Sequence, residues 1–431
     1  MGINSCGTTM LDQGVYSNIG TVTWDTTAKT SNFTATSGSG FFVNTTSGAI
    51  TVTLPSSPSA GNIVAIKDYA NTADTNNITI DRNGSNIRGS ASNAVLDTEG
   101  ISIFLVYVDG TQGWRPTNSA KKSDLAGPFI EATGGTITES GDFKIHTFTS
   151  PGTFCVTNAG APSGSTTVDY MVVAGGAGGG GDNGCGSGGS GGGGAGGFRE
   201  SHSTPVSGCY TASPLATPTA LPVSVQGYPI TVGAGGTGGC VSNPGGSGAT
   251  SVFSTITSAG GGGGARFNRT SNTGGSGGGQ GANNGSGQTT GSAGNTPPVS
   301  PPQGNKGGNS MSFGGGPGRG SSGGGGATAA GTNNPSGTDG TAGGAGATTN
   351  ITASPVAYSG GGGGGGWNGA SAGSGGTGGG GAGGSTAPGS NGTANRGGAG
   401  GGAGPTNVGG TPARPGGTGG SGIVVIRYKF K

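Results

Sequence analysis

The hydrophobic residues of this chain fall in short apolar strings, not in long helical stretches. Between residues 15 and 118 these strings alternate with polar residues or are rich in β-branched residues, which is typical of strands. Turn sequences such as Asp81-Arg82-Asn83-Gly84 and Asp109-Gly110 separate them. We therefore predict a compact β-sandwich module over 15–118. An irregular arm is expected over 1–14.

The β pattern resumes after a polar linker at residues 119–128. Residues 129–174 are predicted to form a small β base, and residues 423–431 are predicted to be a closing strand. Four apolar strings are expected to pair in one sheet, so that the last strand locks the chain end beside the entry strand. These strings are 143–148, 168–173, 230–232 and 423–426.

Glycine dominates residues 175–422, and the chain has 111 Gly and 23 Pro among its 431 residues. Such a composition is typical of disorder, but the apolar strings between the glycine runs indicate an anchored structure. Interior glycines disfavour an α-helix, and they leave a strand without side chains to pair. The remaining regular conformation is the left-handed polyproline II helix, with about three residues per turn. We predict a bundle of short polyglycine II helices from one chain.

Such helices make no internal hydrogen bonds, so their peptide groups need partners on neighbouring helices. Glycine has no side chain to bury, and its ordering is costly. A nearly complete set of hydrogen bonds between helices is therefore expected. Runs of 13–20 residues would extend roughly 40–60 Å and place their connecting loops at the pole opposite the base sheet.

Charged residues make up only 8% of the chain, and its formal net charge is +2. This composition does not favour nucleic acid or an anionic membrane surface as partner. The apolar strings are far shorter than the roughly 20 residues that span a bilayer. The first residues match neither a signal peptide nor the myristoylation pattern. We expect that the protein folds in a cytosol, or leaves it by a route other than an N-terminal signal, and that it does not insert into a membrane.

Few residues of this sequence are candidates for catalysis or for metal binding. No CxxC spacing is present, and free buried thiols are the favoured reading of the five cysteines, with a disulfide among Cys185, Cys209 and Cys240 as the alternative. His146 lies in a predicted strand and is expected to be structural. Asp68 and its neighbouring acids are expected in turns or on the surface. We expect no enzymatic activity, no cofactor and no metal.

Several ordered motifs carry a resemblance to known families. In the first part of the chain they are residues 49–55, 78–84, 106–110 and 113–114, and in the second part 143–148, 152–154, 170–176, 228–236 and 419–428. On these motifs, residues 15–118 are similar to a module of marine bacteriophage tail fibres, and residues 132–428 are similar to the glycine-rich domain of phage tail fibres and adhesins. The three cysteines at 185–240 and the proline-rich segment 297–302 depart from that pattern.

The resemblance implies a virion receptor-binding fibre whose loops, displayed on a rigid polyglycine II scaffold, recognise the host surface. Its partners would be a polysaccharide or outer-membrane protein and other tail proteins, and a homotrimer is expected. The alternatives are a non-viral surface-coat or filament protein and an ice-binding protein. Aromatic and polar residues where the glycine runs break are the candidate contacts. These are Arg266, Phe267, Asn268, Arg269, Trp367 and Asn368.

Overall fold

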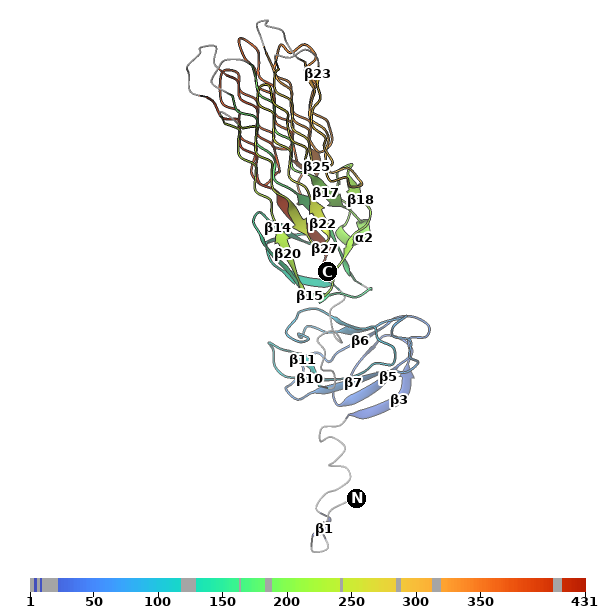
Figure 1. Cartoon of the computed structure of the whole chain (residues 1–431). Helices are drawn as coiled ribbons and strands as arrows, with labels where there is room; N and C mark the ends of the chain where they lie inside the picture. The colour runs from blue at the N-terminus through green and yellow to red at the C-terminus, as the bar shows by residue number, and fades with distance from the viewer. Residues whose placement is uncertain are drawn as a thin grey trace. The chain divides into compact units, whose positions relative to one another are not determined.

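The computed structural model describes residues 22–117, 129–162, 164–182, 188–240, 243–283, 288–311, 319–405 and 413–431, with two short strands near the start. Those strands, β1 (Asn4–Ser5) and β2 (Thr8–Thr9), pair antiparallel. The chain forms two compact units, Met1–Glu131 with Asn158–Thr166, and Ala132–Thr157 with Thr167–Lys431 (Figure 1). Most of the predicted arm and the predicted linker at 119–128 lie outside the described residues.

The first unit is built from two β-sheets around one apolar core. Alternation places Ile50, Val52 and Leu54 in the core, while Thr51 and Thr53 between them are only partly buried. The five-stranded sheet has the order β11-β10-β7-β5-β3, and the four-stranded sheet has the order β4-β6-β8-β9. The strands are β3 (Thr23–Lys29), β4 (Phe33–Thr34), β5 (Ser39–Val43), β6 (Ile50–Thr53), β7 (Ile63–Asp68), β8 (Ile78–Asp81), β9 (Ala94–Leu96), β10 (Ser102–Tyr107) and β11 (Trp114–Pro116).

The route of the chain through this unit differs from a sandwich of antiparallel hairpins. From β3 to β8 the chain alternates between the two sheets, so β3, β5 and β7 are parallel in one sheet and β4, β6 and β8 are parallel in the other. Only β9, β10 and β11 add antiparallel pairs. The predicted two-layered β core is therefore present, but its first half is wound as a coil.

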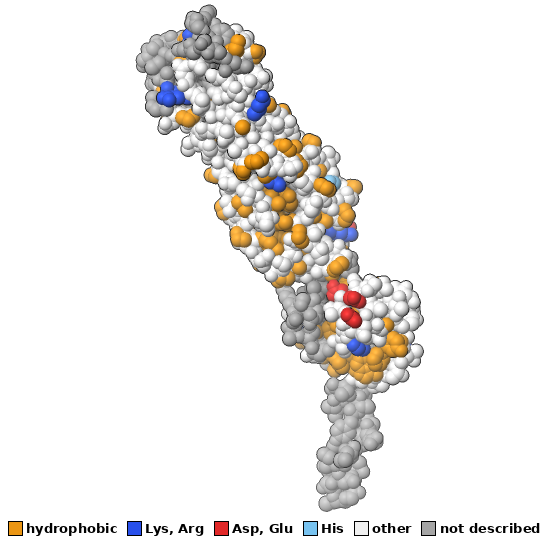
Figure 2. Space-filling view, turned by 45° about the vertical axis from the view of Figure 1, so that its right-hand side comes forward, with side chains coloured by type: hydrophobic (Ala, Val, Ile, Leu, Met, Phe, Trp, Pro, Cys, Tyr) orange, Lys and Arg blue, Asp and Glu red, His pale blue; other side chains and the backbone are white. Residues whose placement is uncertain are grey.

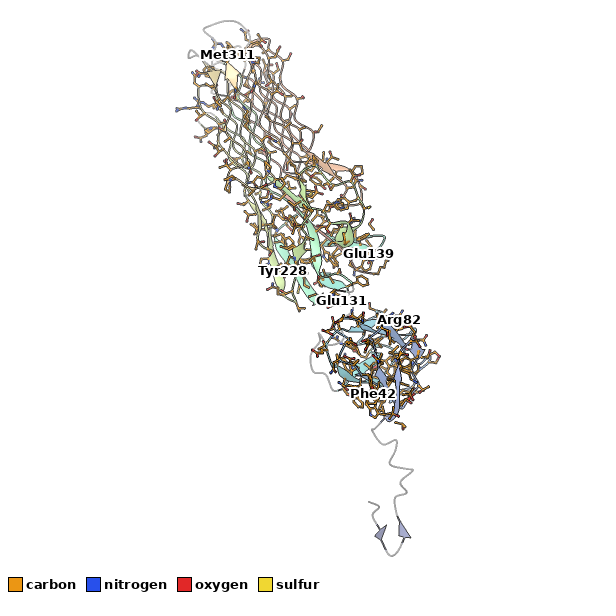
Figure 3. The ribbon with its side chains drawn as sticks, turned by 90° about the vertical axis from the view of Figure 1, so that its right-hand side faces the viewer. Phe42, Arg82, Glu131, Glu139, Tyr228 and Met311 are labelled. Atoms are coloured by element: carbon orange, nitrogen blue, oxygen red, sulfur yellow. The ribbon has the colours of Figure 1, made fainter. Side chains whose placement is uncertain are left out.

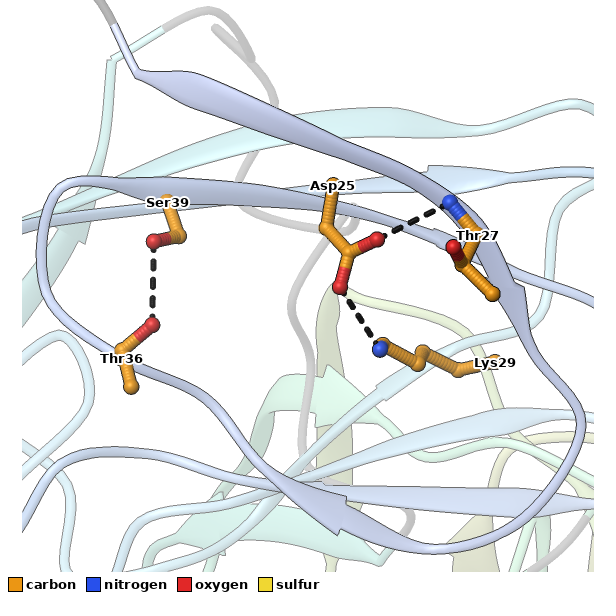
Figure 4. A network of polar contacts seen from close by, with 5 residues as sticks. All are labelled: Asp25, Thr27, Lys29, Thr36 and Ser39. Carbon is orange, nitrogen blue, oxygen red and sulfur yellow. Dashed lines mark hydrogen bonds and ion pairs between the residues drawn. The ribbon is translucent and has the colours of Figure 1, made fainter.

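The edge strand β3 carries a polar cluster (Figure 4). The Asp25 carboxylate accepts hydrogen bonds from the Thr27 N–H at 2.9 Å and from Lys29 Nζ at 2.7 Å. These contacts, led by the Lys29 bond, lower the pKa of the exposed Asp25 carboxyl. The register between β3 and β5 shifts between Asp25 and Lys29. A bulged, charged edge of this kind disfavours pairing with another strand.

The second unit has its main sheet at one end of the glycine runs (Figure 1). The closing strand β27 (Ile423–Lys429) pairs with β14 (Phe143–Phe148) on one side and β16 (Thr167–Val173) on the other. The prediction that the last strand locks beside the entry strand is confirmed. Both β16 and β27 are almost wholly buried, as expected for central strands covered on both faces. The remaining strands of this sheet are β13 (Thr136–Ser140), β17 (Phe198–Ser201), β18 (Ala216–Thr217) and β19 (Leu221–Pro222).

The string at 230–232 was predicted to join this sheet, and that prediction is wrong. It ends β20 (Gly227–Thr231), which pairs with β15 (Gly152–Ala159) and β21 (Ser251–Phe253) in a separate sheet. Its inward Tyr228 packs against Phe154 and Phe253 of those partners. The other elements are β12 (Ile130–Thr133), β22 (Ile256–Ser258), the antiparallel pairs β23 (Gln288–Thr289) with β24 (Ser310–Met311) and β25 (Ala347–Thr349) with β26 (Val356–Tyr358), and, within the described residues, one four-residue helix, α2 (Thr204–Ser207).

The glycine runs adopt the predicted polyglycine II arrangement. In the 174–182 run every third N–H donates to the same neighbouring run, at N···O distances of 2.9–3.0 Å. None of the glycines from Gly175 to Gly181 has a φ between +20° and +160°, which fits the left-handed helix. Three neighbouring runs accept these bonds in turn. The N–H groups of Ala174, Ala177 and Gly180 donate to the carbonyls of Gly197, Gly194 and Gly191, respectively. Those of Gly175 and Gly178 donate to Ala249 and Gly246, and those of Gly176 and Gly179 donate to Gly420 and Gly417.

The carbonyl groups of the same run bind three further runs, so six neighbours enclose it in a hexagonal array. Gly175 and Gly178 accept from Gly261 and Gly264, Gly176 and Gly179 from Gly236 and Gly239, and Ala177 and Gly180 from Gly400 and Ala403. The 188–197 and 359–366 runs are enclosed by six neighbours in the same way. A Cβ added to any glycine of the 174–182 or 359–366 run would lie 1.9–2.5 Å from a neighbouring backbone atom.

The described runs are shorter than predicted. The 359–366 run, which ends at the described turn of residues 367–370, has eight residues, which corresponds to about 25 Å, less than the expected 40–60 Å. The chain reverses there at Trp367 and Asn368, which interrupt the glycine, so this turn begins earlier than the composition alone suggested.

Candidate functional site

The buried polar residues at the base bind backbone and side chains of the fold itself. Asp169 accepts from Ser201 Oγ at 2.7 Å, the Ser203 N–H at 2.7 Å and Ser207 Oγ at 2.5 Å. Arg427, opposite Asp169 in the sheet, donates from Nε to the Ser207 carbonyl at 2.8 Å. This network fastens the segment after β17 to the sheet, which is a structural role.

A second buried carboxyl group, Glu200, fastens two other segments. It accepts from the Ser213 N–H at 3.0 Å and from Thr349 Oγ1 at 2.5 Å. Burial raises the pKa of Glu200, and the two hydrogen bonds oppose that shift. Burial, followed by the charges of Glu200 and Asp169, also raises the pKa of the Tyr210 hydroxyl. Glu200 therefore joins β17 to the segments of Ser213 and Thr349, which is a structural role.

His146 has the structural environment that the sequence predicted. Its Nδ1 lies 2.8 Å from the Gly134 carbonyl and its Nε2 lies 3.0 Å from the Tyr428 hydroxyl. The ring stacks on Tyr428 and meets the edge of Phe154. Burial lowers the pKa of His146, because a charged imidazole would lose its hydration there. Asp68 was expected in a turn or on the surface, and that expectation is wrong. It ends β7, is fully buried and accepts from the Ala73 and Gly100 N–H groups, which is a structural role.

The two predicted contact segments lie at the same end of the glycine runs, far from the main sheet. A chain of backbone hydrogen bonds joins them across this end. The Asn268 N–H donates to Ala282, Ala282 to Gly189, Gly189 to Arg319, and Arg319 to Trp367, at 3.0–3.2 Å. We call this end of the bundle the tip; β23 lies at the same end in Figure 1, and Met311 at the same end in Figure 3.

Each contact segment is a tight turn that asparagine helps to form. The Arg269 N–H donates to the Arg266 carbonyl, and Asn268 has a φ of 56°. The Ala370 N–H donates to the Trp367 carbonyl, and Asn368 has a φ of 53°. Asparagine tolerates this left-handed region better than most residues. Both asparagines therefore have a conformational role in addition to any contact they make.

The six predicted contact residues are not equally displayed. Asn268 and Arg269 are exposed, and Arg266, Trp367 and Asn368 are partly buried. Phe267 is only 4% exposed, and its ring occupies the space beside Gly188 and Ala282. The expectation that Phe267 is presented at the surface is therefore wrong, because this ring seals the end of the array.

Two tip arginines were not singled out from the sequence. The guanidinium of Arg319 lies over the Trp367 ring, with Cζ 5.4 Å from its centroid, a cation–π arrangement. Arg414 begins the 413–422 run, and its carbonyl accepts from the Asp182 N–H at 3.0 Å. Each stands at a boundary of a glycine run, a position that is visible in the sequence as a lone cation beside glycine.

The first unit offers a separate surface, the outer face of its five-stranded sheet. The Trp24 ring lies against Gly40, where an added Cβ would approach it to 2.7 Å. Phe42 lies 5.0 Å from Trp24, and Phe104 lies 6.2 Å from it, between ring centroids. Tyr69 beside Phe42 is 58% exposed. Hydrophobic side chains also gather on this unit in Figure 2, and Phe42 is labelled in Figure 3.

Cysteines and metal ligands add no site within the described residues. Cys155, Cys209 and Cys240 are free thiols, and Cys209 and Cys240 are exposed instead of buried as predicted. Cys6 and Cys185 lie outside the described residues. Among the described residues, no group of three His, Cys, Asp or Glu is placed to hold a metal ion. The described helices include none that is long and apolar enough to span a bilayer.

Comparison with protein families identifies the second unit only. A family model described as a glycine-rich domain matches residues 149–429. No curated protein matches the chain.

Proposed function

We propose that this chain, which belongs to the glycine-rich domain family over residues 149–429, is a receptor-binding fibre protein of a bacteriophage virion. In this proposal the glycine bundle is a rigid scaffold, and the turns at its tip contact the surface of the host cell. The protein would be made in the host cytoplasm and assembled into the tail. It would catalyse no reaction.

The observation that carries the proposal is the joint placement of the two contact turns at the tip. Loops carry function when a rigid scaffold presents them. Here the hydrogen-bonded array holds the backbone of Arg269 and Trp367 at one end of the glycine runs. At the other end, the runs continue into the paired strands of the main sheet. An aromatic ring stacked with a guanidinium suits either a sugar ring or a loop of an outer-membrane protein.

The first unit would attach the protein to other tail proteins, as a homotrimer. Its outer sheet face supplies the aromatic surface that such an interface needs, through Trp24, Phe42, Phe104 and Tyr69. Sedimentation of the full chain would measure its oligomeric state. A monomer at micromolar concentration would contradict the trimer.

A non-viral surface coat or filament is the second candidate, because the same array could serve a purely structural role. An ice-binding protein is a third candidate, and it requires a flat face of regular composition. The neighbouring 232–240 and 413–422 runs expose a mixed set of side chains, which does not favour that use. These are Ala234, Thr237 and Cys240 on one run and Pro415 and Thr418 on the other.

Two measurements test the proposal. Gold-labelled antibodies against the chain should mark phage tails in material from its source; labelling of cell surfaces or filaments would support the second candidate. Virions carrying Arg269→Ala with Trp367→Ala should then adsorb more weakly to host cells. Ser374→Ala, an exposed position along the bundle, is the matched control. Equal adsorption of all virions, with unchanged melting temperatures, would contradict a receptor-binding tip.

A further inference from the structure

The charges of this chain are strongly segregated along the sequence. Residues 1–200 contain 9 Lys and Arg against 15 Asp and Glu, a net charge of −6. Residues 201–431 contain 9 Lys and Arg against a single acid, Asp339, a net charge of +8. The near-neutral total of +2 therefore conceals an acidic first part and a basic second part. A local excess of one sign concentrates ligands of the opposite sign.

Four arginines of the second unit have their backbone at the tip. Arg266 and Arg269 delimit the first contact turn, Arg319 lies beside Trp367, and Arg414 begins the run next to Asp182. Basic side chains are visible along the bundle in Figure 2. Two acids share this end. Asp182 is only 2% exposed, and Asp339 accepts from the Ser371 N–H at 2.7 Å.

The identity of these cations matters as much as their number. Guanidinium groups are planar and bind carboxylate, sulfate and phosphate oxygens through two parallel hydrogen bonds, which lysine cannot do. The single lysine of the glycine bundle, Lys306, instead lies part-way along it, where the neighbouring Asn305 carbonyl accepts from Gly277. At the tip, the Trp367 ring beside Arg319 adds a flat apolar surface to the cationic one.

We infer that the tip binds an anionic polysaccharide, with the arginines holding its acidic groups and Trp367 stacking on a sugar ring. This inference rests on the proposed receptor-binding function and narrows the receptor class to a glycan that carries carboxylate or sulfate groups. The positive charge of residues 201–431 adds a long-range attraction for such a polymer.

The test uses the full chain and three immobilised polymers: dextran sulfate, polygalacturonic acid and uncharged dextran. Binding to at least one charged polymer is expected at low ionic strength, with weakening as salt is added. The two charged polymers distinguish sulfate from carboxylate as the preferred group. Binding of the uncharged dextran with equal affinity, or of no polymer at all, would overturn the inference.

Arg269→Gln and Arg414→Gln test whether the tip is responsible. Each should weaken binding roughly two- to fivefold, and the double variant should weaken it further. Lys306→Gln removes the same charge from an exposed side chain along the bundle and should have no effect. Equal losses in all variants would show non-specific attraction by the whole basic unit and would refute the inference.

Adsorption to cells separates this inference from the proposed function. If the arginine variants lose binding to cells while the intact chain ignores both charged polymers, the tip is a receptor site and the anionic ligand is wrong. If the arginines govern polymer binding but cells bind all variants equally, the polysaccharide site stands and the receptor-binding function fails.

Discussion

Replacing Gly363 by valine should destabilise the glycine bundle severely, because this residue has no free side. Gly363 lies in the enclosed 359–366 run, where its N–H donates to Gly381 and its carbonyl accepts from Gly402, both at 2.9 Å. An added Cβ would lie 2.1 Å from the Gly373 carbonyl oxygen, whereas ordinary contact begins at 3.4 Å. The neighbouring run would have to move by more than about 1 Å.

The magnitude follows from what that displacement breaks. The two neighbouring runs are joined by hydrogen bonds from Gly373 to Gly364 and from Gly376 to Gly361, both at 2.8 Å. Loss of each bond costs about 0.5–1.5 kcal/mol net, and overpacking adds about 1–3 kcal/mol. Valine also lowers the conformational entropy of the unfolded chain relative to glycine, and this stabilises the folded protein by only about 0.4–1 kcal/mol. The free energy of unfolding should fall by roughly 2–5 kcal/mol.

The assay is denaturant unfolding of the full chain, with Ser374→Val as the matched control. Ser374 is adjacent to Gly373 in the neighbouring run, but it is exposed, so the same valine side chain is introduced there without a clash. Gly363→Ala should reproduce most of the loss of stability seen with valine, because the Cβ atom alone already collides. A Gly363→Val variant as stable as Ser374→Val would refute the close-packed array.

Three further predictions can be tested on the same protein. Burial lowers the pKa of His146, so below its ordinary pKa the unfolded chain binds a proton at this imidazole that the folded chain does not bind. The free energy of unfolding should therefore fall as pH drops below about 6.5. The free energy of unfolding of His146→Gln should depend less steeply on pH over the same range. Removal of residues 1–118 should leave a soluble glycine unit with an unchanged melting transition that no longer joins the particle; normal incorporation would contradict the attachment role. In the native protein Cys240 should react with a thiol reagent faster than the partly buried Cys155, and mass spectrometry of the labelled peptides would show it.

The sequence predicted the conformation of the glycine runs well, because interior glycines disfavour both helix and strand and the apolar strings between the runs indicated an ordered structure. It predicted their lengths poorly, because the place where a run turns depends on neighbours from distant parts of the chain. The sequence also contains a signal that distinguishes runs at the surface of the array from enclosed runs. The peripheral 232–240 run exposes every third residue, Ala234, Thr237 and Cys240, whereas the enclosed 174–181, 188–197 and 359–366 runs contain only Gly, Ala and Ser. A local period of three therefore marks a run at the surface of the array.

Two other features were not accessible from local pattern. Alternation of apolar and polar residues is the same for parallel and antiparallel strands, so it predicted a two-layered first unit without its coiled route. Phe267 lies between two polar residues, Arg266 and Asn268, and this local pattern predicts an exposed side chain. Its burial depends on Gly188 and Ala282, which come from other runs.

The uniformity of the glycine runs leaves their register to be fixed elsewhere. A run that slipped by three residues past its neighbours would keep every type of backbone hydrogen bond, since the pattern repeats with that period. Contacts outside this repeat must therefore set the register. At the base, Val173 and Phe198 are anchored in paired strands. Within the array, Ser321 Oγ donates to the Ser190 carbonyl at 2.6 Å and the Gly365 carbonyl at 2.9 Å.

The buried serines of the array add hydrogen bonds to neighbouring runs. The Ser190 hydroxyl donates to the Gly181 carbonyl at 2.9 Å, and the Ser322 hydroxyl donates to the Gly308 carbonyl at 2.6 Å. After a slip of three residues each hydroxyl would meet another carbonyl of the same row, because the carbonyls repeat with that period, so the serines do not select the register. The register is therefore selected where the runs end, by paired strands such as those of Val173 and Phe198 and by rings such as that of Phe267, which fills one particular space. A tip whose turns must hold Arg269 and Trp367 at fixed positions requires that selection.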